Sequence, residues 1–175
     1  VNAAGDGVAG AFADQDAARI AGLLDLNVKA LTTLTRHVLP GMLARGRGGV
    51  LNVASLGAYA PGPWQATYYA SKAYVVSFSE AIAAETGGQG VRIAALAPGP
   101  VATDFHERMG SITAFYLQFL PVQTADAVAR SAYWRFRLGQ RVIIPGLFCS
   151  VLALAMRVIP HRILVALIGF LLKPR

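Results

Sequence analysis

Cysteine is almost absent from this sequence, with Cys149 the only one among 175 residues. A single cysteine excludes a scaffold held together by internal disulfides, and it is typical of a reducing compartment. Its thiol is therefore expected to be a small buried apolar group. We expect a cytoplasmic protein whose stability comes from a hydrophobic core, and 175 residues are enough to form that core as one domain.

Acidic residues are also scarce, with nine Asp and Glu against 16 Lys and Arg, which gives a net charge of +7. A basic balance can favour an acidic partner. The basic residues are nevertheless spread singly along the chain, and none lies in an aromatic and basic stretch typical of nucleic-acid modules. We therefore predict no nucleic-acid binding. The spacing of the three histidines does not indicate a metal site either.

The start of the chain lacks both an initiator methionine and the signature of a secretory signal. The sequence begins at Val1, without a basic start or a long apolar run. We read it as the continuation of a longer chain.

No apolar run reaches the roughly 20 residues needed to cross a bilayer. The two longest apolar segments, 147–159 and 163–172, are separated by Pro160, His161 and Arg162. We expect two helices packed over a sheet or across a subunit interface of a homo-oligomer. The alternative is peripheral membrane contact through residues 147–175, which would make the protein membrane-associated, because basic residues flank the apolar segments. Those residues are Arg157, His161, Arg162 and Lys173.

Helical and strand-like patterns alternate along the rest of the chain. Short apolar runs of the kind found in strands covered on both faces occupy residues 50–54, 91–96 and 141–144. Helical patterns occupy residues 16–45, 66–85 and 125–137. This order predicts an α/β fold with a doubly wound, Rossmann-type parallel sheet. We expect one domain over residues 1–175, with an apolar helical tail at 147–175.

The first helix carries a polar residue on its apolar stripe. Asn27 lies on that stripe, and a buried amide needs hydrogen-bond partners. We also expect Pro40 and Gly41 to bend or interrupt the last turns of this helix. The apolar residues that define the stripe are Ile20, Leu24, Leu31, Leu34 and Val38.

Tyr68 and Lys72 form the first chemical pair in the sequence. They are four residues apart in a helical segment, so their side chains share one face of the helix. A free phenol has a pKa of about 10, too high for proton transfer near neutrality. An ammonium beside it favours the phenolate and is expected to lower that pKa. The pair is therefore suited to general acid and base catalysis.

Ser55 directly follows the strand-like segment 50–54 and is expected at its carboxyl end, where open α/β sheets bind ligands. No G-x-S-x-G elbow surrounds any serine, so Ser55 is interpreted as a group that polarises a substrate oxygen. Chance would give a Tyr-x-x-x-Lys pair about 0.1 times in a chain of this composition, and adding the serine lowers this to roughly 0.004.

Five motifs now stand in order along the chain, and together they resemble the short-chain dehydrogenase/reductase (SDR) superfamily. They are Asn2-Ala-Ala-Gly5, Asn27, Ser55, Tyr68-x-x-x-Lys72 and Pro98-Gly-Pro-Val-Ala-Thr103. The resemblance covers nearly the whole chain, from the fourth strand of that fold onward. It implies an oxidoreductase that moves a hydride between NAD or NADP and a carbonyl or alcohol carbon.

The resemblance also implies roles for four catalytic residues. Tyr68 would be the general acid and base, and Lys72 would lower its pKa and hold the ribose of the cofactor. Ser55 would polarise the carbonyl, and Asn27 would hold a water that links Lys72 to solvent.

The cofactor-binding residues implied by the resemblance are Asn2, Ala4, Gly5, Tyr68, Lys72, Pro98, Gly99, Val101 and Thr103. Residues after Thr103 would form a loop that closes on the substrate, with Phe105, Phe115 and Tyr116 in it. The aromatic loop and the apolar tail favour a hydrophobic small-molecule carbonyl or alcohol as substrate.

Two departures from the family pattern qualify this interpretation. Ala3 replaces the second asparagine of the family motif, which removes an amide near the sheet. No Gly-x-x-x-Gly-x-Gly phosphate loop occurs in these residues, so the chain resembles a family member that lacks the N-terminal part of the Rossmann fold. The alternative function is therefore a catalytically inert fragment that acts only by association.

Overall fold

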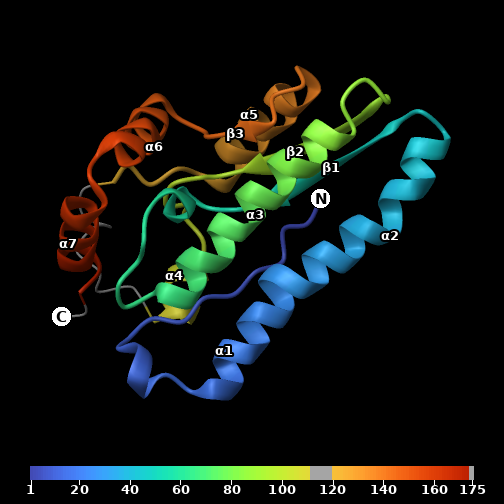
Figure 1. Cartoon of the computed structure of the whole chain (residues 1–175). Helices are drawn as coiled ribbons and strands as arrows, with labels where there is room; N and C mark the ends of the chain where they lie inside the picture. The colour runs from blue at the N-terminus through green and yellow to red at the C-terminus, as the bar shows by residue number, and fades with distance from the viewer. Residues whose placement is uncertain (111–119, 174–175) are drawn as a thin grey trace.

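The computed structural model describes residues 1–110 and 120–173 (Figure 1). Three strands alternate with the helices, as β1 (Gly48–Val53), β2 (Val91–Leu96) and β3 (Val142–Ile143). The helices are α1 (Ala17–Leu24), α2 (Leu31–Ala44), α3 (Ala66–Glu85), α4 (Phe105–Met109), α5 (Ala125–Arg137), α6 (Leu147–Val158) and α7 (His161–Leu172). Shorter turns complete the described chain, namely η1 (Phe12–Asp14), the π-helical η2 (Asp25–Ala30) and η3 (Leu56–Tyr59).

The strands form one parallel sheet in the order β1-β2-β3. The β1 and β2 strands pair along their whole length, from Gly48 opposite Val91 to Val53 opposite Leu96. Asn2 extends the sheet beyond β1 through a parallel bridge to Asn52. The parallel α/β fold predicted from the sequence is confirmed.

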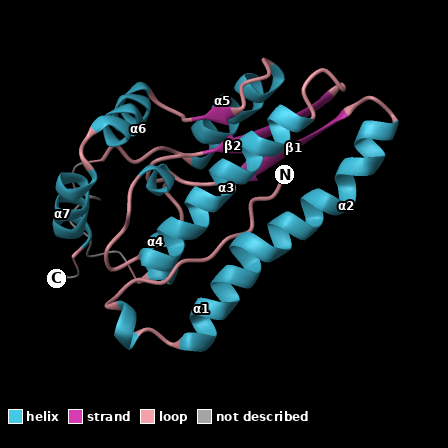
Figure 2. Cartoon of the chain, viewed as in Figure 1, coloured by secondary structure: helices cyan, strands magenta, loops and turns pink. Residues whose placement is uncertain are grey.

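Helices cover both faces of the sheet because alternate residues of each strand point to opposite sides (Figure 2). Ala95 and Ala97 pack with Val75 and Val76 of α3 on one face. On the opposite face, β2 residues pack with α5, in a cluster made of Ala94, Leu96, Val128, Ala132 and Ile143. The sheet is therefore doubly wound, as predicted.

The apolar stripe predicted for the first helix is largely wrong. Leu24, Leu34 and Val38 are exposed, and the buried residues lie four apart at Leu23, Asn27, Leu31 and Thr35. The π-helical turn η2 explains the difference, because its wider turn keeps residues four apart on one face. Pro40 does not interrupt the helix, since α2 continues through it to Ala44.

The tail forms two helices at one end of the molecule, beside each other and away from the centre of the sheet (Figure 1). Their inner sides pack on the segment after β1, in a cluster of Leu56, Cys149, Ala153, Met156 and Leu164. Cys149 is buried there, as expected. Among the described residues, no helix is long and apolar enough to cross a membrane.

Candidate active site

Ser55 is positioned where two parallel strands end. The backbone N–H of Ala54 donates to the carbonyl of Leu96, and Leu56 donates to the carbonyl of Pro98. The segments after β1 and β2 are thereby tied together at the carboxyl edge of the sheet. Ser55 begins the turn η3, and its Oγ accepts a hydrogen bond of 3.1 Å from the Gly57 N–H. The position predicted for Ser55 is the one found.

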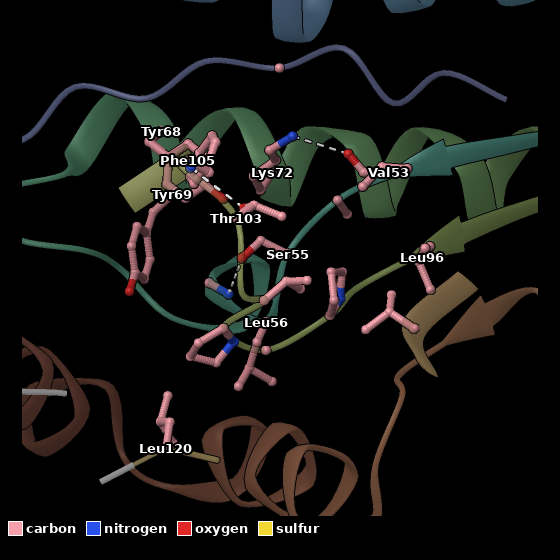
Figure 3. Close-up of a pocket in the computed structure, with 18 of the residues that line it drawn as sticks. Val53, Ser55, Leu56, Tyr68, Tyr69, Lys72, Leu96, Thr103, Phe105 and Leu120 are labelled. Carbon is pink, nitrogen blue, oxygen red and sulfur yellow. Dashed lines mark hydrogen bonds between the residues drawn. The ribbon is translucent and has the colours of Figure 1, made fainter. Parts of the chain in front are cut away.

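Tyr68 lies in the first turn of α3 and is buried. Its ring packs against Tyr69 and Phe105, with centroids 5.9 and 5.5 Å away. Ser55 and Tyr68 both line the cavity described below, although they are 13 positions apart in the chain (Figure 3). The Ser55 side chain is close enough to act on the pKa of the Tyr68 phenol.

Lys72 lies one helical turn after Tyr68 and is also buried. Its Nζ donates a 3.0 Å hydrogen bond to the carbonyl of Val53 at the end of β1 (Figure 3). Nζ is 5.7 Å from the centre of the Tyr68 ring. Burial of the ammonium lowers the pKa of Lys72 to about 8. The Val53 carbonyl is a partner that sequence reasoning missed, because a backbone group leaves no residue-type signal.

The pKa of Tyr68 differs from the sequence-based expectation. Burial raises it to about 12, and the Ser55 side chain lowers it by less than burial raises it. Desolvation of the phenolate therefore sets the direction of the shift. The expected lowering is therefore not found in this structure. Tyr68 is protonated at neutral pH, which is the state that a proton donor requires.

Asn27 uses its amide to hold the backbone of the segment before it. Its Oδ1 accepts from the N–H of Asp6 at 3.0 Å, and its Nδ2 donates to the Asp6 carbonyl at 2.9 Å. The same Nδ2 donates to Ser71 Oγ at 3.0 Å, and Ser71 Oγ donates to the Tyr68 carbonyl. The buried amide predicted to need partners has them. Through Ser71, it joins the segment at Asp6 to the helix that carries Tyr68.

Replacing Asn27 with alanine is expected to lower the free energy of unfolding by about 3 kcal/mol, because three buried hydrogen bonds lose one partner each. Urea unfolding would measure the change. Ser71→Ala is the matched control, since it removes a smaller part of the same network, and we expect it to cost about 1 kcal/mol. Equal losses for the two variants would contradict the central position given to Asn27.

Gly5 is placed where a side chain would compete with this polar group. A Cβ at Gly5 would lie 3.2 Å from Lys72 Nζ and 3.4 Å from Asn27 Oδ1. Asn2, by contrast, directs its amide away to Asn52 and Thr35, and its backbone pairs with β1. Asn2 and Ala4 are not among the residues that line the cavity described below. Of these three, the structure brings only Gly5 to the cavity wall.

The segment 98–103, after β2, forms another part of the wall of the same cavity. Pro98, Gly99, Val101 and Thr103 all line the cavity. The segment is held in place by Gln123, whose N–H donates to the Pro100 carbonyl and whose carbonyl accepts from Ala102. Glycine at position 99 allows close packing, because a Cβ there would lie 2.7 Å from Cys149 Sγ.

One cavity of about 970 Å³ includes Ser55, Tyr68 and Lys72 in its wall (Figure 3). Its size is at the upper end of small-molecule sites. The apolar tail, which the sequence already links to a hydrophobic substrate, forms part of its wall. Which tail residues reach the cavity could not be predicted, since no local signal shows which part of the sheet a helix will cover. Those residues are Leu152, Met156, Ile159, Leu164, Ile168 and Leu171.

Two further aromatic groups border the site. Phe105 of α4 lies against Tyr68, and Tyr69 lines the same cavity. Trp64 instead donates its indole N–H to the carbonyl of Gly169, which fastens the loop before α3 to α7. Phe115 and Tyr116, which the sequence places in the closing loop, lie outside the described residues.

The donors in this wall fit a nicotinamide cofactor. Among residues 1–110 and 120–173, Lys72 Nζ has one hydrogen-bond partner, so two of its three N–H groups remain for a ligand. Gly5 beside it keeps the space next to Nζ free of a side chain. Two adjacent donors in that space suit the vicinal hydroxyls of a ribose.

Curated proteins with similar sequences are reductases and dehydrogenases. The chain is 36% identical over 102 residues to the ketoacyl reductase HetN of Nostoc sp., which covers 58% of this chain and 36% of that protein. It is 35% identical over 100 residues to a 3-oxoacyl-[acyl-carrier-protein] reductase of Synechocystis sp., and this match covers 57% of this chain and 40% of that protein. The matched part is thus less than half the length of either relative.

Two solved dehydrogenase structures share the fold of this chain. A short-chain dehydrogenase from Sphingobium yanoikuyae in complex with NADPH has a TM-score of 0.78 and 29% identity, over 89% of this chain and 59% of that one. The bulky-bulky ketone specific alcohol dehydrogenase from Comamonas testosteroni has a TM-score of 0.71 and 29% identity, over 88% of this chain and 58% of that one. The short chain dehydrogenase family model matches residues 1–112, and this chain belongs to that family.

Proposed function

We propose that this chain carries the proton-transfer and carbonyl-binding residues of an NAD(P)-dependent oxidoreductase. The observation that supports this most directly is the grouping of Ser55, Tyr68 and Lys72 in the wall of one large cavity. The NADPH bound by the similar Sphingobium dehydrogenase favours a nicotinamide cofactor here as well.

Each of these residues has a distinct task in carbonyl reduction. A bound, reduced nicotinamide cofactor supplies a hydride to the carbonyl carbon. Tyr68 donates its phenolic proton to the carbonyl oxygen, and Ser55 donates a hydrogen bond that orients and polarises that oxygen. Lys72 can return a proton to Tyr68, because its pKa of about 8 allows it to exchange protons near neutral pH. In the alcohol-oxidising direction the same groups act in reverse order.

The substrate is proposed to be a bulky apolar ketone or the corresponding alcohol. The side of the cavity formed by α6 and α7 is lined by aliphatic residues such as Leu152, Met156 and Ile168. An apolar wall of this kind gains affinity from each methylene that it covers, about 0.8 kcal/mol. The specificity stated for the Comamonas dehydrogenase is consistent with this class.

Consumption of NADPH and of NADH, followed by absorbance, would test the proposal. The ketones to compare are acetone and a phenyl alkyl ketone. We expect turnover with at least one cofactor, and a kcat/KM at least tenfold higher for the larger ketone, since the added apolar surface contributes well over 1.4 kcal/mol. Cofactor binding without any turnover, or no cofactor binding at all, would favour an inert fragment that acts only by association.

We also propose that the protein is a homo-oligomer. Exposed apolar residues of α1 and α2, Leu24, Leu34 and Val38, form a surface suited to a second copy. Tyr74 of α3 borders them, since its hydroxyl is 2.8 Å from Thr32 Oγ1 of α2. Sedimentation velocity would test the proposal, and a single monomeric species at micromolar concentration would exclude it.

A further inference from the structure

The outer sides of α6 and α7 form an apolar surface that the rest of the described chain leaves uncovered. Five of its residues define it, and each is at least 59% exposed. We call it the tail surface, and its residues are Leu147, Val151, Leu154, Val158 and Ile163. Figure 1 shows both helices at one end of the molecule.

The inner sides of the same helices are already buried in the protein. Cys149, Ala153 and Met156 of α6 are buried, as are Leu164 and Leu172 of α7. The two helices are therefore apolar on both sides, whereas a helix at the surface of a water-soluble domain normally has a polar outer side. Leu147, Val151, Leu154 and Val158 are spaced three or four residues apart and therefore share one face of α6.

The charged side chains of the tail itself are all basic. The sequence contains no Asp or Glu after Asp126, whereas Arg157, Arg162 and Lys173 lie at or near the ends of α6 and α7. Arg157 is held close to the body of the protein, 5.0 Å from the centre of the Tyr59 ring. An apolar surface with basic residues at its edges is complementary to an anionic lipid surface.

A second copy of this chain fits the tail surface less well. A two-fold contact places the same patch of both copies together, so the cations of one copy would face those of the other. The tail has no carboxylate with which to neutralise them. Like charges brought together in this way oppose association.

The length of the helices decides how they can meet a bilayer. Each has 12 residues and is therefore about 18 Å long, shorter than the hydrocarbon core of a membrane. They can lie in the plane of the interface, with apolar side chains inserted and basic side chains among the headgroups.

We propose that the tail surface of α6 and α7 docks this protein on anionic membranes as a peripheral, non-spanning contact. The proposal depends on the composition and exposure of the two helices and not on the chemistry of the cavity.

Flotation of the purified protein with vesicles tests this proposal. One set of vesicles is phosphatidylcholine alone, and the other contains phosphatidylcholine and phosphatidylglycerol. We expect binding to the anionic set, weakened by high salt. Leu154→Gln with Ile163→Gln should reduce the partition coefficient at least tenfold, because two inserted side chains are lost. Arg162→Gln with Lys173→Gln should reduce it roughly tenfold for anionic vesicles only.

Trp134→Gln with Leu138→Gln is the matched control, since it removes two equally exposed apolar residues from α5 and the loop after it. This control should float like the unaltered protein. Circular dichroism of every variant establishes that it is folded. Flotation of none of the proteins, or equal flotation of all of them, overturns the proposal. The proposal is also overturned if the tail variant with two glutamines floats like the unaltered protein and differs from it only in forming a smaller oligomer in sedimentation velocity.

Discussion

Replacing Tyr68 with phenylalanine is expected to lower kcat by about 10²- to 10⁴-fold, the usual contribution of a positioned general acid. The change removes only the phenolic oxygen, so the ring keeps its contacts with Tyr69 and Phe105. The affinity for NADPH should stay within about threefold, because it depends on Lys72 and the segment 98–103. Steady-state kinetics and fluorescence titration of the cofactor would measure the two effects separately.

The control for this variant is Tyr74→Phe on the same helix. Tyr74 is exposed, and its hydroxyl pairs with Thr32 on the outside of the molecule. Its loss should leave kcat unchanged. If Tyr68→Phe retained more than a tenth of the unaltered kcat, Tyr68 would not be the proton donor, and the proposed roles of Ser55 and Lys72 would have to be reassigned.

The parts of the fold that follow local rules could be predicted from the sequence. The ranges 66–85, 91–96 and 125–137 coincide with α3, β2 and α5, because glycines, prolines and capping residues mark their ends. Tyr68 and Lys72 could be paired because their spacing matches one helical turn. Ser55 could be joined to them because ligands bind at the carboxyl ends of parallel strands, where the structure places it.

What the sequence could not provide depends on packing between distant segments. The buried face of α1 and α2 was mispredicted because a π-helical turn shifts which residues face the core, and composition does not reveal such a turn. The direction of the Tyr68 pKa shift was wrong because desolvation depends on how completely Phe105 and the other neighbours enclose the ring. The apolar tail suggested a hydrophobic substrate, but the residues that line the cavity, such as Met156 and Ile168, could not be identified because the tail shows no motif.

Lys72→Met is expected to abolish detectable turnover and, at the same time, to make the protein more stable at neutral pH. The buried ammonium has a pKa of about 8 against 10.5 in the unfolded chain. Burying the protonated amine therefore lowers the free energy of unfolding by about 3 kcal/mol at pH 7. Methionine fills similar space without charge and loses only the hydrogen bond to Val53, worth about 1 kcal/mol. The net expected gain is about 2 kcal/mol.

The pH dependence identifies the cause of this gain. Between pH 8 and 10.5 the unfolded chain binds more protons at Lys72 than the folded protein does, so the stability of the unaltered protein rises with pH in this range. Tyr68, with its pKa raised from 10.0 to about 12, has the opposite effect only above pH 10. Urea unfolding at pH 7 and pH 9.5 should therefore show the advantage of Lys72→Met shrinking as pH rises. If Lys72→Met were less stable than the unaltered protein at pH 7, Lys72 would stabilise the fold. Burial of its ammonium would then not lower the free energy of unfolding.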